Sequence, residues 1–347
     1  MRRALTVLLA LLLAGCGMKD ARAPFLDSQA PPGLAPRFYP PEGWAWGLAQ
    51  PKRQPPQRYG VASPPVVPRA EVLILPGLGE SAEVWFETAR ELVSRGATVW
   101  ILEGAGQAGS ARFGGQREIA HTPGYEPDVA GLIAVRDEVM RGGSGAPVFI
   151  LASGDAAPVV LVAISRGLRA EGLILTSPHL TTGVIMSPLR AAEVRFGLGG
   201  LPAPGAQRWR RDGLDGVKLR LTHDAWRGGI NGAWQLANPD LRFAGPSLGW
   251  RAGRLAASRA ALRGANGIKV QVLVLAPNSD SKTARELCSR LGRCDLRLFG
   301  DAEPALHLEA DRYRAAWLDA ITARVFSAKG EAARPAKIDL SEPKMSR

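Results

Sequence analysis

Cysteine and histidine are scarce in this chain of 347 residues, which contains three cysteines and four histidines. No set of His, Cys or Asp residues has metal-ligand spacing, and no glycine-rich phosphate loop ending in Lys-Ser or Lys-Thr occurs. The sequence therefore predicts neither a metal centre nor a nucleotide site, and we expect no cofactor. The composition, 46% hydrophobic with 6% aromatic residues, is that of an ordinary globular protein.

The amino terminus has the pattern of an export signal. Two arginines precede an apolar run from Ala4 to Ala14, which is too short to span a membrane as a mature helix. Leu13-Ala14-Gly15-Cys16 resembles the bacterial lipobox, in which the cysteine is diacylated after cleavage. We predict a lipoprotein signal peptide over residues 1–15 and a lipidated Cys16. An uncleaved anchor, or an ordinary signal peptide with a chance cysteine, is the alternative.

The lipobox implies a location in the bacterial cell envelope. Membrane lipids would be partners through Cys16, and the protein would face the periplasm. Because the residue after Cys16 is Gly17 and not aspartate, we expect the outer membrane.

The remaining cysteines, Cys288 and Cys294, lie at the end of a predicted helix and the start of a predicted strand. An exported protein meets an oxidising compartment, so a disulfide between them can persist. Two unpaired buried thiols are the alternative.

Residues 16–68 are rich in proline, so little regular structure is expected there and we interpret them as a tether. Trp44 and Trp46 are unusual in a linker and should dock onto the domain or lie at the lipid surface. The formal net charge of +12 comes from arginines scattered along the chain. It suits either attraction to anionic lipid head groups or a generally arginine-rich composition. No nucleic-acid-binding motif is present, so no nucleic-acid partner is expected.

Apolar strands alternate with helices through the rest of the chain, which predicts an α/β fold with a doubly wound, mostly parallel sheet. Strands are expected over Ala70–Leu75, Ala97–Leu102, Phe149–Leu151, Gly172–Thr176, Val270–Leu275 and Leu296–Phe299, and helices over about Ser81–Arg95 and Glu126–Met140.

Several motifs carry a resemblance to a known family. Pro76-Gly77-Leu78-Gly79-Glu80 is similar to His-Gly-x-Gly-Glu, with proline in place of histidine. Residues 103–110, EGAGQAGS, are similar to Asp-x-Arg-Gly-Gln-Gly-x-Ser, and Tyr125 with Asp128 matches Tyr-x-x-Asp. The strings LTHDAWR, NPDLRFAGPSLGW and RAGRLAASRA follow. Together these resemble the lysophospholipase and monoacylglycerol lipase branch of the α/β-hydrolases over about residues 70–326.

This resemblance implies an α/β-hydrolase fold with an inserted helical cap. The core would comprise residues 69–178 and 266–327, the cap residues 179–265, and the end of the chain, residues 328–347, would be a disordered tail.

The family's nucleophile elbow corresponds to residues 147–160, PVFILASGDAAPVV, where small residues two before and two after the nucleophile permit a sharp turn. A nucleophile at position 154 has Ala152 and Ala156 at those places, whereas one at Ser153 would have Leu151 and Asp155. The turn therefore selects Gly154, which has no side chain to attack a substrate.

The other triad positions give a mixed result. By resemblance, Asp280 occupies the position of the acid, while the position of the histidine is Pro304, with His307 three residues further along. Because Pro304 cannot accept a proton, restoring serine at position 154 alone is expected to restore little activity.

Alternative catalytic groups remain open. Ser153 could act if the register slipped by one residue, and Asp155 could act as a carboxylate nucleophile. Asp280 could instead be only a loop cap. The backbone N–H groups of Leu78 and Asp155 would form the oxyanion hole, although the Asp155 carboxylate would oppose a developing oxyanion. The other histidines, His121, His179 and His223, are interpreted as polar contacts and not as bases.

The leading hypothesis is a membrane-anchored pseudo-hydrolase that binds an acyl lipid or lysophospholipid without cleaving it. The alternative is an active lysophospholipase-like carboxylester hydrolase that uses Asp155 or Ser153 with His307. A scaffold that uses the fold only for protein interaction is a third class.

Overall fold

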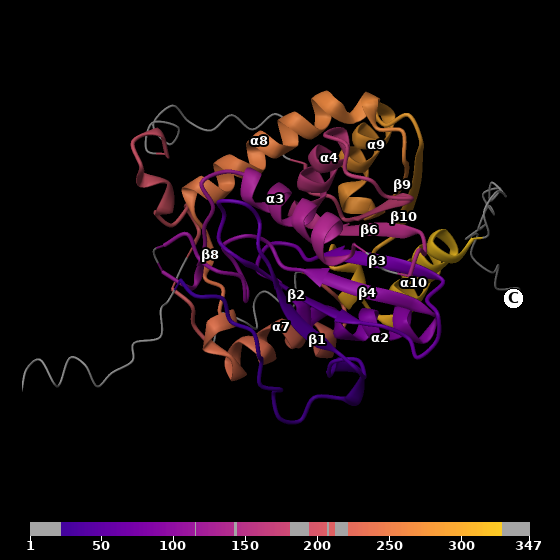
Figure 1. Ribbon diagram of the computed structural model, residues 1–347, viewed down its shortest axis with the longest axis horizontal. Helices are drawn as coiled ribbons and strands as arrows, with labels where there is room; N and C mark the ends of the chain where they lie inside the picture. The colour runs from indigo at the N-terminus through magenta and orange to yellow at the C-terminus, as the bar shows by residue number, and fades with distance from the viewer. Residues whose placement is uncertain are drawn as a thin grey trace, which may run out of the picture.

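The computed structural model describes residues 22–114, 116–141, 144–180, 194–206, 208–211 and 221–327. Its centre is an eight-stranded sheet in the order β1-β2-β4-β3-β6-β7-β9-β10 (Figure 1). The strands are β1 (Ala45–Ala49), β2 (Gln57–Ala62), β3 (Ala70–Leu75), β4 (Ala97–Leu102), β6 (Val148–Ser153), β7 (Gly172–Thr176), β9 (Gln271–Pro277) and β10 (Cys294–Phe299). From β4 to β10 all neighbours are parallel, and β2 runs antiparallel to β1 and β4. The predicted α/β class is confirmed.

Helices cover both faces of the sheet (Figure 1). One face carries α3 (Glu126–Ala134), α4 (Ala157–Ser165) and α9 (Ser281–Arg290), and the other carries α2 (Phe86–Ser94) and α10 (Asp311–Phe326). Two further helices, α7 (Ala225–Ala237) and α8 (Leu248–Gly264), belong to the predicted cap, and α8 packs along α4. A two-stranded sheet joins β5 (Ile119–Ala120) to β8 (Gly245–Pro246). Short 3-10 turns occupy Pro36–Phe38, Ala82–Trp85, Gly154–Ala156, Leu198–Gly200, Pro239–Leu241, Ala265–Gly267, Asn278–Asp280 and Leu306–Leu308, and Val135–Val139 is π-helical.

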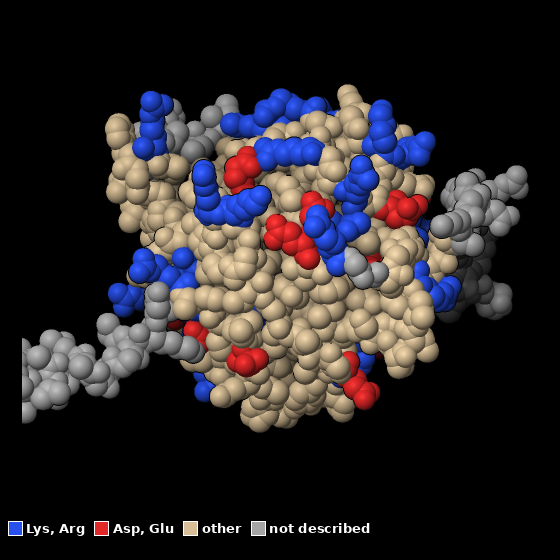
Figure 2. All heavy atoms as spheres, in the orientation of Figure 1, with Lys and Arg blue, Asp and Glu red and all other residues tan. Residues whose placement is uncertain are grey.

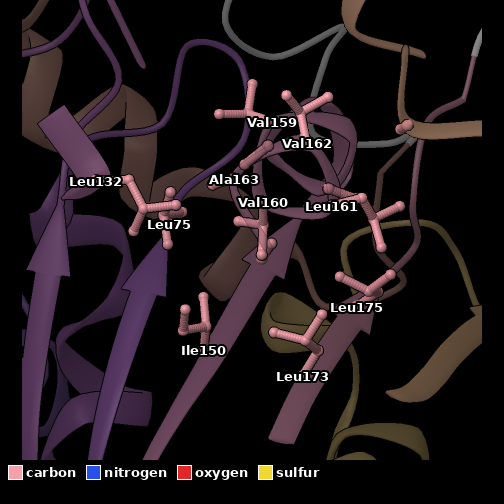
Figure 3. Packing of buried hydrophobic residues seen from close by; sticks show 14 of the residues in the cluster. Leu75, Leu132, Ile150, Val159, Val160, Leu161, Val162, Ala163, Leu173 and Leu175 are labelled. Atoms are coloured by element: carbon pink, nitrogen blue, oxygen red, sulfur yellow. The ribbon is translucent and has the colours of Figure 1, made fainter. Parts of the chain in front are cut away.

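The core beneath α4 holds the predicted elbow in place. Val160 and Leu161 of α4 are fully buried, and they lie over Ile150 of β6 and Leu173 and Leu175 of β7 (Figure 3). Strands with both faces covered read as continuous apolar runs, which is why these segments could be located from the sequence.

The first two strands differ from the expectation of a tether over residues 16–68. Trp44 and Trp46 pack against Phe86 of α2, with ring centroids 5.0 and 6.2 Å apart. A Cβ at Gly60 of β2 would collide with the Trp44 ring, so glycine is required there. Proline-rich segments flank these two short strands, which pair with each other, and β2 joins the sheet through the more distant β4.

A buried ionic cluster fixes β2 to the loop after β4. The Arg58 side chain is fully buried and donates from Nε and Nη2 to Glu103 and from Nη2 to Glu83 at 2.5 to 2.9 Å. Its guanidinium lies 4.1 Å from the ring of Trp46. Burial would lower the pKa of Arg58, but the charges of Glu103 and Glu83 outweigh it and raise that pKa. Arg58 therefore keeps its charge at physiological pH.

Cys288 and Cys294 are joined by a disulfide, with their Cα atoms 5.4 Å apart. Cys16, the signal peptide and the tail over residues 328–347 lie outside the described residues. Within the described ranges, no helix is long and apolar enough to cross a membrane.

Candidate functional site

The elbow predicted at residues 147–160 is a sharp turn between β6 and α4. Gly154 has φ of +51°, a backbone conformation that side-chain-bearing residues rarely adopt, and the small residues Ala152 and Ala156 are buried beside it. Among the described residues other than its chain neighbours, a Cβ placed on Gly154 would come within 4 Å of His179 alone, at 3.5 Å from Nδ1. The turn that would present a nucleophile therefore forms at Gly154, and there is room beside His179 for the side chain that glycine lacks.

His179 lies directly over this turn. Its backbone N–H donates to the Gly154 carbonyl at 3.0 Å, and its half-exposed ring places Nδ1 3.5 Å from Oδ2 of Asp155. The hydrogen bond and charge of Asp155 raise the pKa of His179 above its ordinary value despite burial, and the charges of Asp280 and Glu80 add to the increase. Asp155 thus pairs with a histidine, and that histidine is His179.

The position of the missing base has a structural role. Pro304 presents its carbonyl to the hydroxyl of Ser177, which donates at 2.6 Å, and to the Leu306 N–H at 2.9 Å. Asp280 lies in the 3-10 turn after β9, and its buried Oδ2 has no hydrogen-bond partner among the described residues. A carboxylate therefore remains at the acid position, but position 304 holds proline, so there is no imidazole for that carboxylate to orient.

His307 is turned away from this role. It is 2% exposed and stacks on Trp85 with ring centroids 4.0 Å apart and planes 5° apart. Its Nε2 lies 3.4 Å from Oε1 of Glu80, whose Oε2 accepts from the Gly77 N–H and from Trp85 Nε1. Burial favours the neutral acid, but His307 and these donors outweigh it and lower the pKa of Glu80. His307 therefore anchors the loop over residues 76–80.

This loop runs against the elbow, since a Cβ on Gly77 would lie 3.6 Å from the Ser153 carbonyl oxygen. Gly79 has φ of +75° and donates its N–H to Gln107 at 3.0 Å, which leaves the half-buried Leu78 at the tip. Ser153 is buried as the last residue of β6 and pairs with Thr176 in the sheet. It belongs to the strand and not to the turn.

A family model described as serine aminopeptidase, S33, matches residues 67–299. The chain belongs to this family. Its α/β-hydrolase fold and the predicted lipase-like resemblance are both confirmed. A search of the curated proteins finds no match.

Solved structures with this fold include a lipase in its open form, 15% identical with a TM-score of 0.66, covering 82% of this chain and 100% of that one. A monoacylglycerol lipase from Paleococcus ferrophilus is 17% identical with a TM-score of 0.61, covering 78% and 98%. A soluble variant of monoglyceride lipase from Saccharomyces cerevisiae, in complex with a substrate analog, is 14% identical with a TM-score of 0.63, covering 84% and 98%. At these identities the likeness shows the fold.

Two other histidines of this family member make polar contacts away from the elbow, as the sequence suggests. His121 Nδ1 lies 2.8 Å from the Ser247 hydroxyl, and burial lowers its pKa. His223 Nδ1 lies 2.6 Å from Oε1 of Glu309, a carboxylate that also accepts backbone N–H groups. Their side chains hold the cap and the loop after Pro304 in place.

The residue that sequence reasoning missed is His179, which it interpreted as a polar contact. The available signal was its position directly after β7, because the carboxyl ends of neighbouring parallel strands meet at one edge of a sheet. Among the residues that the structure describes, no group of three or more His, Cys, Asp and Glu side chains could hold a metal.

Proposed function

We propose that this protein is a lipid-anchored member of the family that binds an acyl lipid at the elbow without hydrolysing it. The observation that carries the proposal is Gly154, which has the positive φ of a nucleophile turn and no nucleophile. Removing a single triad member costs up to about 10⁶-fold in rate, and here the position of the histidine is also lost.

The contacts around the elbow support binding over the alternative active mechanism. That mechanism pairs His307 with Asp155 or Ser153. Asp155 instead contacts His179, and His307 contacts Glu80 behind the loop over residues 76–80. Ser153 is buried within its strand. Neither Asp155 nor Ser153 contacts His307, so the nucleophile-to-base pair that this mechanism requires is not formed.

The charges at the site indicate a class of acyl lipid. Among the residues that the structure describes, the carboxylates of Asp155, Asp280 and Glu80 all raise the pKa of His179, so negative charge predominates around that ring. A fatty-acid carboxylate would be repelled, whereas the hydroxyl groups of a glycerol head could donate hydrogen bonds to these carboxylates. A neutral acylglycerol therefore suits the site better than a free fatty acid. The structural similarity to monoacylglycerol lipases supports the same class.

Mass spectrometry of lipids that co-purify with the protein tests this function. We expect acylglycerols with the wild type and a reduced amount with Asp155→Asn, which removes one acceptor charge beside His179. The charge-neutralised control Arg293→Gln, at an exposed position beyond α9, should retain the lipid. Protein that is repeatedly empty would favour a scaffold.

Turnover separates the proposal from an active hydrolase. Monoacylglycerol, lysophospholipid and short-chain esters should be hydrolysed no faster by the wild type than by a Ser153→Ala, Asp155→Asn, His307→Ala triple variant. Wild-type activity that Asp155→Asn or His307→Ala abolishes would establish the alternative.

The anchor has its own test. Cys16→Ala removes the predicted acylation site, and we expect the protein to leave the outer-membrane fraction of the cell envelope. Membrane association of a processed Cys16→Ala protein would contradict the lipid anchor.

A further inference from the structure

The chain between Cys16 and the first strand is bound to the domain from Arg22 onward. The Arg22 carbonyl accepts from the Arg112 N–H at 2.8 Å, and the Ala23 carbonyl accepts from Arg117 Nη1 at 2.7 Å. The Phe25 N–H donates to the Gly109 carbonyl at 2.7 Å. These contacts fix the chain within six residues of the predicted lipid anchor, so the long flexible tether expected from the sequence is not available.

The remaining distance is short. Residues 17–21 separate Cys16 from Arg22. An extended chain advances at most about 3.3–3.6 Å per residue, so Arg22 would lie within about 20 Å of the acylated cysteine. This inference therefore rests on the lipid anchor of the proposed function.

We define an anchor face by Arg22, Arg208, Arg211, Arg242, Phe196 and Leu201, which lie on segments close to the docked N-terminal chain. The guanidinium of Arg242 lies 4.1 Å from the ring of Trp209, whose neighbours in the sequence are Arg208 and Arg210. Phe196 and Leu201 are 78% and 47% exposed.

Backbone pairs and one ion pair join the segments that carry the anchor face. Arg117, which binds Ala23, also forms an ion pair with Asp240 at 3.0 Å. The next residues, Ile119–Ala120, pair with Gly245–Pro246, and the Leu248 N–H donates to the Leu201 carbonyl.

Figures 1 and 2, which share one orientation, are consistent with this arrangement. In Figure 1 the start of the described chain, β8 and the segment over residues 194–206 lie on the same side of the molecule. Figure 2 shows a group of basic side chains on that side, near the start of the described chain, and others along the edge where α8 lies. The described carboxyl end, at the end of α10, lies on the opposite side.

We propose that the anchor face lies on an anionic bilayer, so that the docked N-terminal segment sets the orientation of the domain. Three observations support this occupant. The anchor leaves too little chain for the domain to move far from the lipid surface. Arginine matches anionic head groups, and the exposed Phe196 and Leu201 can enter the region between head groups and acyl chains.

The test uses the acylated full-length protein, reconstituted in vesicles of phosphatidylethanolamine and phosphatidylglycerol. A fluorophore is attached at Phe196→Cys or, as control, at Val67→Cys, a site that is 81% exposed and precedes β3 at the amino end of the sheet. Bilayer-restricted quenchers should quench the label at position 196 and spare the label at position 67.

Charge variants test the electrostatic part. A basic residue near an anionic surface contributes about 1 kcal/mol, so Arg208→Gln with Arg211→Gln should shift the equilibrium away from the docked orientation by about thirtyfold. Quenching at position 196 should then fall. The matched pair Arg285→Gln and Arg293→Gln, also exposed, should leave it unchanged.

The outcomes separate the orientation from the anchor. Equal quenching at positions 196 and 67 in protein that resists carbonate extraction would overturn the orientation while the anchor stands. Protein that carbonate extracts would overturn the anchor, and the orientation with it. Quenching at 196 that survives the Arg208→Gln, Arg211→Gln change would refute the role of charge in holding this face to the lipid.

Discussion

Replacing Gly154 by serine should create a weak esterase in a single step. The sequence alone predicts little activity from this change, because the base position is Pro304. The structure alters that expectation, since a Cβ at position 154 would lie 3.5 Å from His179 Nδ1 and, chain neighbours aside, within 4 Å of no other described residue. A serine Oγ one bond further can come within about 2.6–3.2 Å of Nδ1, the distance needed for proton transfer.

The size of the effect follows from two terms. Serine at φ of +51° costs about 1–2 kcal/mol of backbone strain, which should lower the melting temperature by about 2 to 8 °C. A positioned base contributes about 10²–10⁴-fold to the rate. Activity should remain well below that of a complete triad. In a triad the acid binds the ring nitrogen that faces away from the serine, whereas here Asp155 contacts the same Nδ1 that would accept the proton.

Hydrolysis of p-nitrophenyl butyrate and labelling of the introduced serine by a fluorophosphonate measure this effect. Gly154→Ala carries the same strain without a hydroxyl and should be inactive, with a similar melting temperature. Gly154→Ser with His179→Ala should lose about 10²-fold or more relative to Gly154→Ser. Equal activity of these two serine variants would refute the assignment of His179 as the neighbouring base.

Three further predictions concern charge and cross-linking. The pKa of His179, measured by NMR titration, should lie above 6.5 and fall in Asp155→Asn. The stability that the His179–Asp155 pair contributes should be fully present below pH 6.5 and be lost as the pH rises through the raised pKa. A pKa at or below 6.5 would contradict the contact. The disulfide of Cys288 and Cys294 should contribute about 2 kcal/mol, and thiol labelling of denatured, unreduced protein should find neither cysteine reactive. Arg58→Met should cost about 3–5 kcal/mol in urea unfolding, because two buried carboxylates lose their partner. A cost under about 1 kcal/mol would contradict a stabilising role for these ion pairs.

Most of the sheet could be predicted because its strands are buried on both faces. Ala70–Leu75 and Gly172–Thr176 are buried along their whole length and are apolar apart from Glu71 and Thr176, and the observed strands coincide with them. The expected helix over Ser81–Arg95 begins as a 3-10 turn, and the one over Glu126–Met140 ends in a π-helical turn. Such local changes depend on tertiary packing, which the hydrophobic period does not encode.

The site could be predicted in part. The spacing of small residues around Gly154 depends only on local backbone geometry, and the turn forms there. The partners of Asp155 and His307 depend on side chains from other strands and loops. His307 is drawn to Glu80 and to the face of Trp85, contacts that no local pattern in the sequence indicates.

The Arg58 cluster bears on how the chain would acquire its fold during the proposed export. A polypeptide that crosses a membrane from its amino end delivers β1 and β2 first, while the partner strand β4 and the carboxylates of Glu83 and Glu103 arrive later. Until then Arg58 has no counterion and must stay hydrated, and one edge of β2 has no strand to pair with. The β1–β2 hairpin therefore cannot join the sheet at first. During the proposed export, the amino-terminal edge of the sheet can close only after residue 103 has crossed the membrane.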